Sequence, residues 1–481
     1  MYLFTTTGLT FIGLVLYLNR AVWRKTYCSI IFEYPGVDFE ARQFEFGMEL
    51  FETPTVRLSL YDKETTIVEI AQERTRSKTE PNRTDLEDPF IIYDLGDAVC
   101  KDKQWKESLP QVQIFFAVKS NPDPVFLRLM IGLGKGFDCA SRKEIETVLD
   151  LGASPDRIIF AHPYKQESHL RFAREKGVRL MTFDTEEELH KVKRVYPEAR
   201  LVLRVVFDDA TCGLEMGVKF GCRNSEVRPL MELAKDLGLG IYGVCFHIGS
   251  QAGNPRVFRE AIRYTRPIID EGRRLGLDMK LLDIGGGFPG RLYPEEPFGK
   301  FAEAVREALE ENFPPSSGVS VIAEPGTFYT RSAGYLVANV MAKRIYKPRG
   351  NKDTYHNANG STDKAIWMYY LNVGVFNAFN GPLAQLVSTF FEVPEPLHPK
   401  DSGEKQQLKP SCLWGPTCHP HDVIFEKCMM PEMESGDFVM FHDMGGYITS
   451  CASGFNGYEV PPTSYIAPKE SRPLLERIFS A

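Results

Sequence analysis

The chain has 481 residues, 43% of them hydrophobic, a length and composition expected of about two or three globular domains. Its 57 basic and 64 acidic residues leave a net charge of −7 without a dense basic run, which argues against nucleic acid and anionic membranes as partners. The ten cysteines show no paired spacing, which argues against a disulfide framework or a metal site and favours the reducing cytoplasm.

Residues 1–47 form an N-terminal extension that contains an apolar segment at 4–18. This segment is shorter than the roughly 20 residues that span a membrane comfortably. No charged region precedes it and no clear cleavage site follows it, so a signal, an anchor and an inert extension all remain open. We expect a cytoplasmic protein because of the cysteines, with tethering to a membrane through residues 4–18 as the alternative.

From residue 96 to residue 330, short apolar runs alternate with amphipathic segments of helical periodicity. The apolar runs begin at Phe115, Gly136, Ile158, Arg179, Arg200, Ile241, Leu281 and Val321. A typical intervening segment, 142–152, has apolar residues at helical spacing and ends in a glycine suited to a helix C-cap. Eight strands alternating with helices predict an α/β fold, a parallel (β/α)8 barrel.

The remaining parts of the chain predict a second domain, an antiparallel β domain. Over residues 331–481, runs rich in Val, Tyr and Phe alternate with turns. Residues 48–95 are expected to form the N-terminal part of this domain.

The apolar run 115–118 ends in Lys119 and a Ser-Asn-Pro turn, the pattern of a buried strand that delivers an amine at its carboxyl end. Barrel enzymes keep their active sites at that end of the strands. A lysine whose stem is walled by apolar side chains would have its charged form disfavoured, which suits an amine that forms an imine. The alternative is a strand-end lysine whose amine simply reaches water.

Polar residues that follow later strands complement such an amine. Three consecutive glycines, 285–287, would let backbone N–H groups approach a phosphate, and the Ser250 hydroxyl could assist. His247 offers a flat ring and Glu324 a carboxylate. Singly, these are ordinary features of a turn, a core or a cap. Together with Lys119 they match what pyridoxal 5'-phosphate requires: an imine, a phosphate site, ring stacking and a carboxylate for its ring nitrogen.

Several specific motifs carry a resemblance to a known family. They are Phe-Ala-Val-Lys-Ser-Asn at 116–121, Gly-Phe-Asp-Cys-Ala-Ser at 136–141, Phe-His-Ile-Gly-Ser at 246–250, Leu-Asp-Ile-Gly-Gly-Gly-Phe-Pro-Gly at 282–290, Ala-Glu-Pro-Gly at 323–326 and Trp-Gly-Pro-Thr-Cys at 414–418. From Met48 to its end the chain resembles the eukaryotic ornithine decarboxylase family, which has the alanine-racemase-like barrel. The resemblance implies a pyridoxal-phosphate-dependent amino-acid decarboxylase related to polyamine metabolism.

The resemblance also implies residue roles. Lys119 would carry the cofactor as an imine, Glu324 would pair with its ring nitrogen, and Cys418 would protonate the α-carbon after carbon dioxide leaves. The expected cofactor-binding residues are Lys119, Asp138, Arg204, His247, Ser250, Gly285, Gly286, Gly287, Glu324, Pro325, Gly326, Thr327 and Tyr447. In the family one subunit completes the site of the other, so a head-to-tail homodimer with two shared sites is implied.

The chain departs from the family near the cofactor and the substrate. Thr327 replaces an arginine that contacts the phosphate, which predicts weaker cofactor retention. Val373 and His419 stand where the family has the aspartates that hold the distal ammonium of ornithine. We therefore expect ornithine to be a poor substrate and an uncharged aliphatic amino acid such as leucine to be preferred. The expected substrate-binding residues are Val373, Phe376, His419 and Asp422.

Two other functions remain open. The family includes inactive relatives that bind antizyme, the small regulator of ornithine decarboxylase, and the basic segment 170–200 resembles the antizyme-binding face. Retention of both Lys119 and Cys418 argues against an inactive regulator. The barrel class also supports racemases, but the Trp-Gly-Pro-Thr-Cys motif favours decarboxylation. The chain ends soon after Pro468 without a long acidic tail, so we expect a comparatively long-lived protein.

Overall fold

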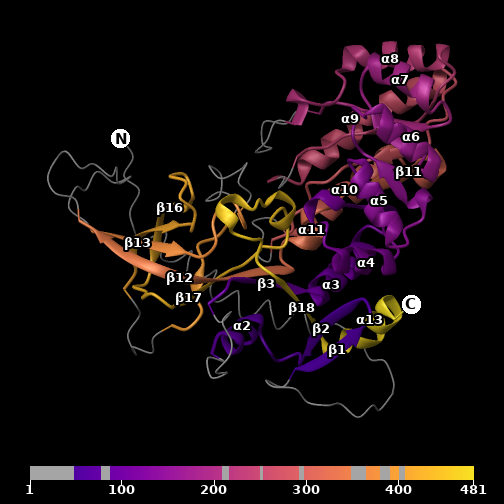
Figure 1. Cartoon of the computed structure of the whole chain (residues 1–481). Coiled ribbons are helices and arrows are strands. Elements are labelled where there is room, and N and C mark those ends of the chain that lie inside the picture. The colour runs from indigo at the N-terminus through magenta and orange to yellow at the C-terminus, as the bar shows by residue number, and fades with distance from the viewer. Residues whose placement is uncertain are drawn as a thin grey trace.

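The computed structural model describes residues 48–76, 87–207, 216–249, 253–291, 297–347, 365–379, 391–399 and 407–480. In this part of the chain a helix-wrapped barrel lies beside an extended sheet (Figure 1). The expected extension 1–47, with its apolar segment 4–18, and Ser250 lie outside the described residues. Within the described ranges, no helix combines the length and the apolarity needed to cross a membrane.

Eight parallel strands close the barrel, and each of the expected apolar runs coincides with one of them. The strands are β4 (Val112–Ala117), β5 (Gly136–Cys139), β6 (Ile158–Phe160), β7 (Leu180–Phe183), β8 (Arg200–Arg204), β9 (Gly240–Cys245), β10 (Leu281–Asp283) and β11 (Ser320–Ala323). Each pairs in parallel with its neighbour in sequence, and β11 pairs with β4 to complete the ring. The expected (β/α)8 barrel is confirmed.

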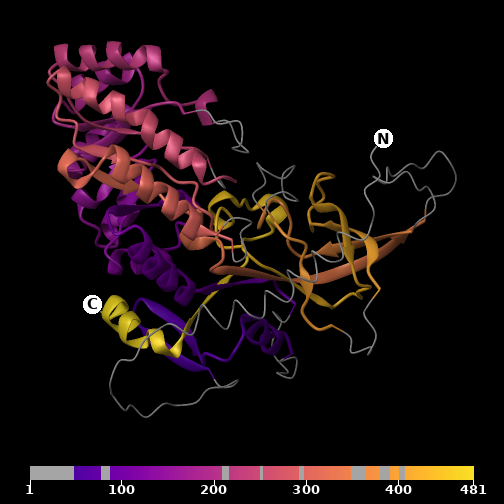
Figure 2. The same cartoon turned by 180° about the vertical axis from the view of Figure 1, so that it is seen from behind.

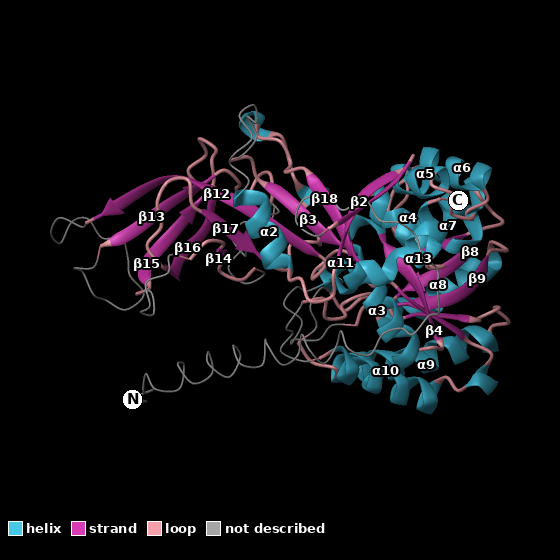
Figure 3. Cartoon of the chain, turned by 90° about the horizontal axis from the view of Figure 1, so that it is seen from below, coloured by secondary structure: helices cyan, strands magenta, loops and turns pink. Residues whose placement is uncertain are grey.

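Helices surround the barrel strands (Figure 3). They are α3 (Leu95–Ser108), α4 (Pro124–Gly132), α5 (Arg142–Asp150), α6 (Glu167–Lys176), α7 (Glu186–Val195), α8 (Asn224–Asp236), α9 (Arg256–Arg274), α10 (Phe298–Asn312) and the short α11 (Thr327–Thr330). Side-chain caps fix where some of them begin: Ser141 accepts from the Glu144 N–H, and Thr185 from the Glu188 N–H. These caps hold the loops that leave the carboxyl ends of the strands.

Alternate residues of the barrel strands fill its interior. Phe115, Ile159, Val202, Cys245, Leu281 and Ile322 form a buried cluster of their own. Their neighbours in sequence, such as Phe116 and Leu201, belong to the larger core between strands and helices. The separation arises because successive side chains point to opposite faces of a strand. The filled interior forms the floor beneath the polar residues at the carboxyl ends.

The second part of the molecule is a ten-stranded sheet. Its strands are β1 (Glu49–Thr53), β2 (Val56–Tyr61), β3 (Phe90–Asp94), β12 (Gly334–Tyr346), β13 (Ile366–Leu371), β14 (Glu395–Pro396), β15 (Lys409–Trp414), β16 (Val423–Met430), β17 (Phe438–Phe441) and β18 (Thr463–Pro468). Residues 48–95 therefore supply three strands to it.

The sheet is mixed, so the expectation of a purely antiparallel domain is corrected. β18 pairs in parallel with β2 and β3, and β13 pairs in parallel with β15. A parallel pair needs a crossover rather than a hairpin, and alternation of apolar residues along a strand does not reveal which connection follows it. The C-terminal strand thus inserts between two strands from the N-terminal part of the chain.

Segments near the N-terminus and near the C-terminus of the described chain connect the sheet to the barrel. Asp94 ends β3 and accepts from the Gly96 N–H, so that strand leads directly into α3. The helix α2 (Ile67–Arg76) covers part of the sheet, and the C-terminal helix α13 (Arg472–Phe479) lies against the first strands (Figure 2). Ile478 of α13 packs onto Gly132 at the end of α4, where a Cβ would approach it to 2.5 Å.

Candidate active site

Lys119 lies at the carboxyl end of β4, where its sequence placed it. It occupies a tight helical turn, Val118–Ser120, directly after the strand. Its amine forms an ion pair with Asp138 on the neighbouring strand β5. The Asp138 side chain is completely buried, whereas the Lys119 side chain is 40% exposed and therefore accessible from outside.

The charge state of Lys119 differs from the expectation. Burial opposes a charged amine, but the surrounding acidic groups, above all Asp138 and also Glu324, outweigh burial and raise the pKa of Lys119. The amine meets carboxylates from other strands, which the apolar run before Lys119 does not reveal. The amine is consequently held as a cation, and it must lose a proton before it can attack a carbonyl group.

Three carboxyl groups at this end of the barrel have an oxygen without a hydrogen-bond partner among the described residues: Asp138 Oδ1, Asp283 Oδ2 and Glu324 Oε1. Burial raises the pKa of Glu324 well above its usual range, and Asp138 and Asp283 add to the effect. Burial also raises the pKa of Asp283, to about 7. Buried carboxyl oxygens normally have a donor, so this set indicates a site for a ligand that brings one.

The turn after β10 is built from glycines because other backbone segments pass close to it. Gly285 and Gly287 have φ angles of 63° and 108°. A Cβ on Gly285 would lie 2.3 Å from the carbonyl oxygen of Phe246, and one on Gly287 would lie 2.6 Å from that of Gly249. Only glycine tolerates both the backbone conformation and the approach, and the turn carries no side chain that would keep an incoming anion from its backbone.

His247, after β9, is a neutral ring in this arrangement. Its Nδ1 accepts the Gly286 N–H at 3.1 Å. Burial, reinforced by the positive charges of Arg204 and Lys119, lowers the pKa of His247 to about 3. A neutral imidazole with one nitrogen engaged is oriented by the glycine turn.

The other expected cofactor residues lie at the ends of β8 and β11 or reach the site from the sheet. Strand β8 ends at Arg204. Strand β11 is followed by Pro325 and Gly326, and α11 begins at Thr327. The Tyr447 N–H donates to the Ser120 carbonyl at 2.8 Å, which places this residue beside the Lys119 turn. Tyr447 has a φ of 58°, a strained conformation for a non-glycine residue.

Sequence reasoning missed two acidic residues of this group. Glu144, in the first turn of α5, accepts the Ala140 N–H at 2.5 Å, and burial raises its pKa. The pattern Ser141-x-x-Glu144 signals a helix cap but not proximity to Lys119. Asp283 lies within the motif at 282–290, but only the pairing of β10 with β11 brings it to Glu324.

Cys418, His419 and Phe376 gather in a second place, on the sheet. The Phe376 ring lies 5.3 Å from His419 and 4.8 Å from Phe455, measured between centroids. Cys418 is exposed, and its backbone N–H donates to Asn456 at 3.0 Å. None of the ring contacts or hydrogen bonds of these residues joins them to Lys119 in the described part of the chain. The described contacts within one subunit therefore do not connect the expected proton donor with the expected cofactor lysine.

Two expected substrate residues have structural positions instead. Val373 is completely buried in the core of the sheet, so it cannot wall a pocket open to substrate. Asp422 is buried, and its carboxylate accepts from the Val375 N–H at 2.8 Å, the Thr417 N–H at 2.9 Å and the Thr417 hydroxyl at 2.6 Å. Asp422 therefore fastens the Phe376 segment to the Cys418 loop, and its oxygens are engaged by the protein.

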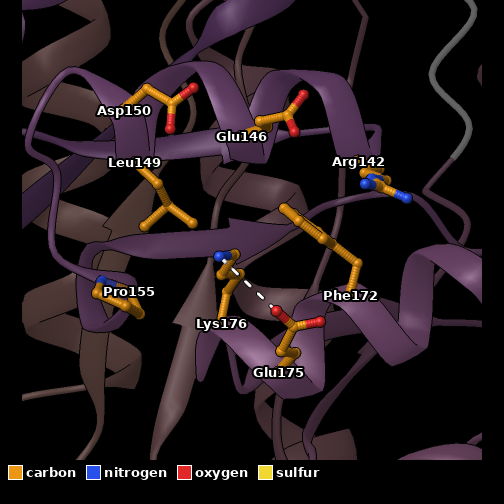
Figure 4. Close-up of a pocket in the computed structure, with 8 residues that line it drawn as sticks. All are labelled: Arg142, Glu146, Leu149, Asp150, Pro155, Phe172, Glu175 and Lys176. Carbon is orange, nitrogen blue, oxygen red and sulfur yellow. Dashed lines mark ion pairs between the residues drawn. The ribbon is translucent and has the colours of Figure 1, made fainter.

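A further concavity lies on the outer surface between α5 and α6, away from these residues (Figure 4). Its volume is about 490 Å³, and charged side chains of both signs line it, with the Arg142 guanidinium 4.6 Å from the Phe172 ring. Three arginines of the expected basic segment 170–200 form ion pairs: Arg171 and Arg194 with Glu167, and Arg174 with Glu198. Acidic side chains therefore engage part of the positive charge on this face.

The residues around Lys119 fit pyridoxal 5'-phosphate. The glycine turn after β10 has no side chains that would keep a phosphate from its backbone. The unpartnered Glu324 oxygen can accept from a protonated ring nitrogen, and neutral His247 offers a face for a ring. Thr327 supplies a hydroxyl, not a charge, at the start of α11.

Comparisons with known proteins agree with this geometry. The family model described as "Pyridoxal-dependent decarboxylase, pyridoxal binding domain" matches residues 95–331. The chain is 40% identical to ornithine decarboxylase of Mus pahari over 405 residues, which cover 83% of this chain and 85% of that one. It is also 40% identical to antizyme inhibitor 2 of Xenopus laevis over 390 residues, covering 81% and 83%. The structure of arginine decarboxylase from Paramecium bursaria Chlorella virus superimposes with a TM-score of 0.74 at 30% identity, covering 83% of this chain and all of that one.

Proposed function

Because the chain belongs to the ornithine decarboxylase family of pyridoxal-dependent decarboxylases, we propose that it converts an uncharged aliphatic L-amino acid, leucine-like in shape, to the corresponding amine. Family membership makes the protein a decarboxylase that uses pyridoxal 5'-phosphate; the choice of side chain is the proposal. The observation that carries it is the cluster of Phe376, His419 and Phe455 next to Cys418.

This cluster presents rings where a cationic substrate would need a carboxylate. Since Asp422 uses both oxygens within the protein, it does not serve as that carboxylate. A cation above an aromatic ring gains about 0.5–2 kcal/mol. Burying an ammonium without an ionic partner costs several kcal/mol, so the rings favour an apolar side chain.

Fewer residues support the preference for an aliphatic side chain than the sequence indicated. Val373 is buried in the sheet core, so the preference rests on His419 and its aromatic neighbours. An aliphatic side chain would gain about 25 cal/mol for each Å² buried against these rings.

We assign the cofactor contacts to the residues around Lys119. Lys119 would hold the cofactor through its amine, Glu324 would face the ring nitrogen and His247 the ring. The glycine turn 285–287, Thr327 and Tyr447 would hold the phosphate, with Asp138 and Arg204 lining the site. When bound, pyridoxal 5'-phosphate accepts the electron pair released as carbon dioxide leaves the α-carbon.

The protein's own residues have two proton tasks. The Lys119 cation must give up a proton before its amine reacts, and the adjacent Asp138 carboxylate can receive it. Cys418 would deliver a proton to the α-carbon. Because Cys418 is exposed and its contacts do not join it to Lys119, we propose that it enters the site of a second copy in a head-to-tail homodimer.

The test is carbon dioxide release by the purified, cofactor-loaded protein from leucine, isoleucine, methionine, ornithine, lysine and arginine. We expect kcat/KM for a leucine-like substrate to exceed that for ornithine by about tenfold or more, equivalent to at least about 1.4 kcal/mol. A higher kcat/KM for ornithine than for every aliphatic amino acid contradicts the proposed specificity.

An antizyme-binding regulator of polyamine synthesis is the second candidate, supported by the similarity to antizyme inhibitor 2. The ion pairs along α6 and α7 weaken it, because two acidic neighbours already engage Arg171, Arg174 and Arg194. Gel filtration of the purified protein mixed with antizyme separates the candidates. A stable complex combined with no decarboxylation of any amino acid would favour the regulator.

A further inference from the structure

Asp283 and Glu324 project from neighbouring strands on the same side of the barrel wall. In the parallel pair β10–β11, Asp283 lies opposite Ile322. Leu281 and Ile322 belong to the interior cluster. Asp283 and Glu324 stand two residues beyond them and so also face inward. Backbone bonds fix the pair: the Ile284 N–H donates to the Ile322 carbonyl at 2.9 Å and the Glu324 N–H to the Gly285 carbonyl at 2.7 Å.

The described residues supply too few donors to satisfy both carboxyl groups as anions. Asp283 is 1% exposed, and its Oδ1 accepts the Gly285 N–H at 2.9 Å. Its Oδ2 and the Glu324 Oε1 have no partner among the described residues, although the two carboxyl groups lie within hydrogen-bonding reach of each other. Two buried carboxylates in contact repel strongly, and a single proton held between them removes both the repulsion and the missing donor.

We propose that Asp283 is a positioning residue that shares one proton with Glu324, and that this pair surrenders the proton when the pyridine ring of the cofactor binds. The proposal rests on the assignment of Glu324 to the ring nitrogen. It goes beyond that assignment because it gives Asp283 a role and states where the proton shared with Glu324 goes when the ring binds. The proton leaves the pair for the ring nitrogen, or for solvent if the ring arrives already protonated. Glu324 is left as the carboxylate that faces a pyridinium.

The charged groups around the pair allow this exchange. Arg204 and the Lys119 amine favour the ionised carboxyl groups, whereas Asp138 and desolvation oppose them. The Cys245 thiol, in the floor of the barrel, also lies near Asp283, and burial raises its pKa, so it stays neutral. Asp138 is already paired with the Lys119 ammonium. The proton that can leave when the cofactor ring binds is therefore the one shared by Asp283 and Glu324.

The test measures protons exchanged with the buffer, not catalysis. The apoprotein is titrated calorimetrically with 4'-deoxypyridoxine 5'-phosphate, which has the ring nitrogen and the phosphate but no aldehyde to react with Lys119. Comparing buffers of different ionisation enthalpy gives the number of protons taken up or released. In Asp283→Asn an amide donor replaces the shared proton, so Glu324 is already ionised. We expect the wild-type protein to release about one proton more, or take up one fewer, than this variant at pH 7 to 8.

Asp94→Asn is the matched control. Asp94 is also a buried carboxyl whose pKa burial raises to about 7, but it caps α3 and accepts from the Tyr61 hydroxyl at 2.8 Å, outside the Lys119 group. Its substitution should leave the proton count of ligand binding unchanged. Equal proton counts for wild type and Asp283→Asn, or the same shift in Asp94→Asn, overturn the proposal.

If Asp283→Asn does not fold, Asp283→Ser also removes the carboxyl group and leaves a hydroxyl that can donate to Glu324, so it should show the same difference of about one proton from wild type. An unchanged count in that variant also overturns the shared proton. Failure of the apoprotein to bind the ring compound at all would instead contradict the cofactor assignment, so the two ideas fail by different results.

Discussion

The Lys119 amine and the Asp138 carboxylate form an ion pair across the carboxyl ends of the adjacent strands β4 and β5. The pair stabilises the ammonium form, which is unreactive toward an aldehyde, at the residue that we propose binds the cofactor. Loading of the cofactor therefore depends on how readily this contact opens and transfers its proton.

Removing the carboxylate should make cofactor loading easier at lower pH. In Asp138→Asn the amine loses its strongest anionic partner, so its pKa falls and more neutral amine is present at a given pH. The measurement is labelling of the apoprotein by pyridoxal phosphate and borohydride within a fixed time. We expect the pH of half-maximal labelling to be lower in this variant. Asp102→Asn, which breaks the pair with Lys135 at the opposite end of β5, is the control. An unchanged or higher midpoint in Asp138→Asn would count against this role.

Lys119→Ala should abolish the absorbance of lysine-bound cofactor and reduce decarboxylation below detection. The reason is that Lys119 is the amine at the carboxyl end of β4 next to the acidic group and the glycine turn. Absorbance spectra and borohydride labelling followed by peptide mapping check this. A reducible adduct that persists in the variant would place the reactive lysine elsewhere.

His247 should make the stability of the apoprotein depend on pH. Its pKa is about 3 in the folded protein against an ordinary 6.5, so the folded state disfavours the imidazolium. The neutral ring makes its full contribution to the free energy of unfolding above about pH 6.5. This contribution decreases by a few kcal/mol in total as the pH falls toward 3. The difference in unfolding free energy between wild type and His247→Phe should shrink over this range.

Urea unfolding at several pH values measures that difference. His190→Phe, at an exposed position on α7, is the control for the same substitution at the surface, and the pH dependence measured for His247→Phe should exceed that of this variant. A pH-independent difference for His247→Phe would show that the ring is not held neutral.

Asp422→Ala should loosen the Cys418 loop. The carboxylate accepts three hydrogen bonds from Val375 and Thr417, and leaving those donors unsatisfied costs about 1–3 kcal/mol. We expect lower unfolding free energy and a lower kcat, with partial recovery in Asp422→Asn, which keeps one acceptor oxygen. Glu426→Ala, at an exposed position on β16, should change neither. A fully active, fully stable Asp422→Ala protein would refute the positioning role.

His419→Asp should shift substrate preference toward ornithine or lysine. The substitution places a carboxylate beside Phe376 and Phe455, where a distal ammonium needs one. We expect the ratio of kcat/KM for ornithine to that for leucine to rise by about tenfold or more. His421→Asp adds the same charge two residues away and should change the ratio less. Equal shifts in both variants would indicate a general charge effect rather than a substrate contact.

Local pattern in the sequence was enough to determine the barrel and the position of Lys119 at the end of β4. Each apolar run marks a strand because burial on both faces requires a continuous apolar segment, and each helix between them shows its periodicity within its own residues. The placement of Lys119, Asp138, His247 and the glycine turn at the carboxyl ends follows from the same periodicity.

The tertiary structure alone decided the charge of Lys119, the contact between Asp283 and Glu324, the burial of Val373 and the engagement of Asp422. Each depends on which strands become neighbours or on how a loop closes over distant residues, as when Asp422 reaches Val375 across 47 positions of the chain. Sequence spacing carries little information about such contacts, because electrostatic and packing energies depend on distances in space between residues that are remote in sequence. For the same reason the mixed pairing of the sheet was not predictable from strands that individually looked alike.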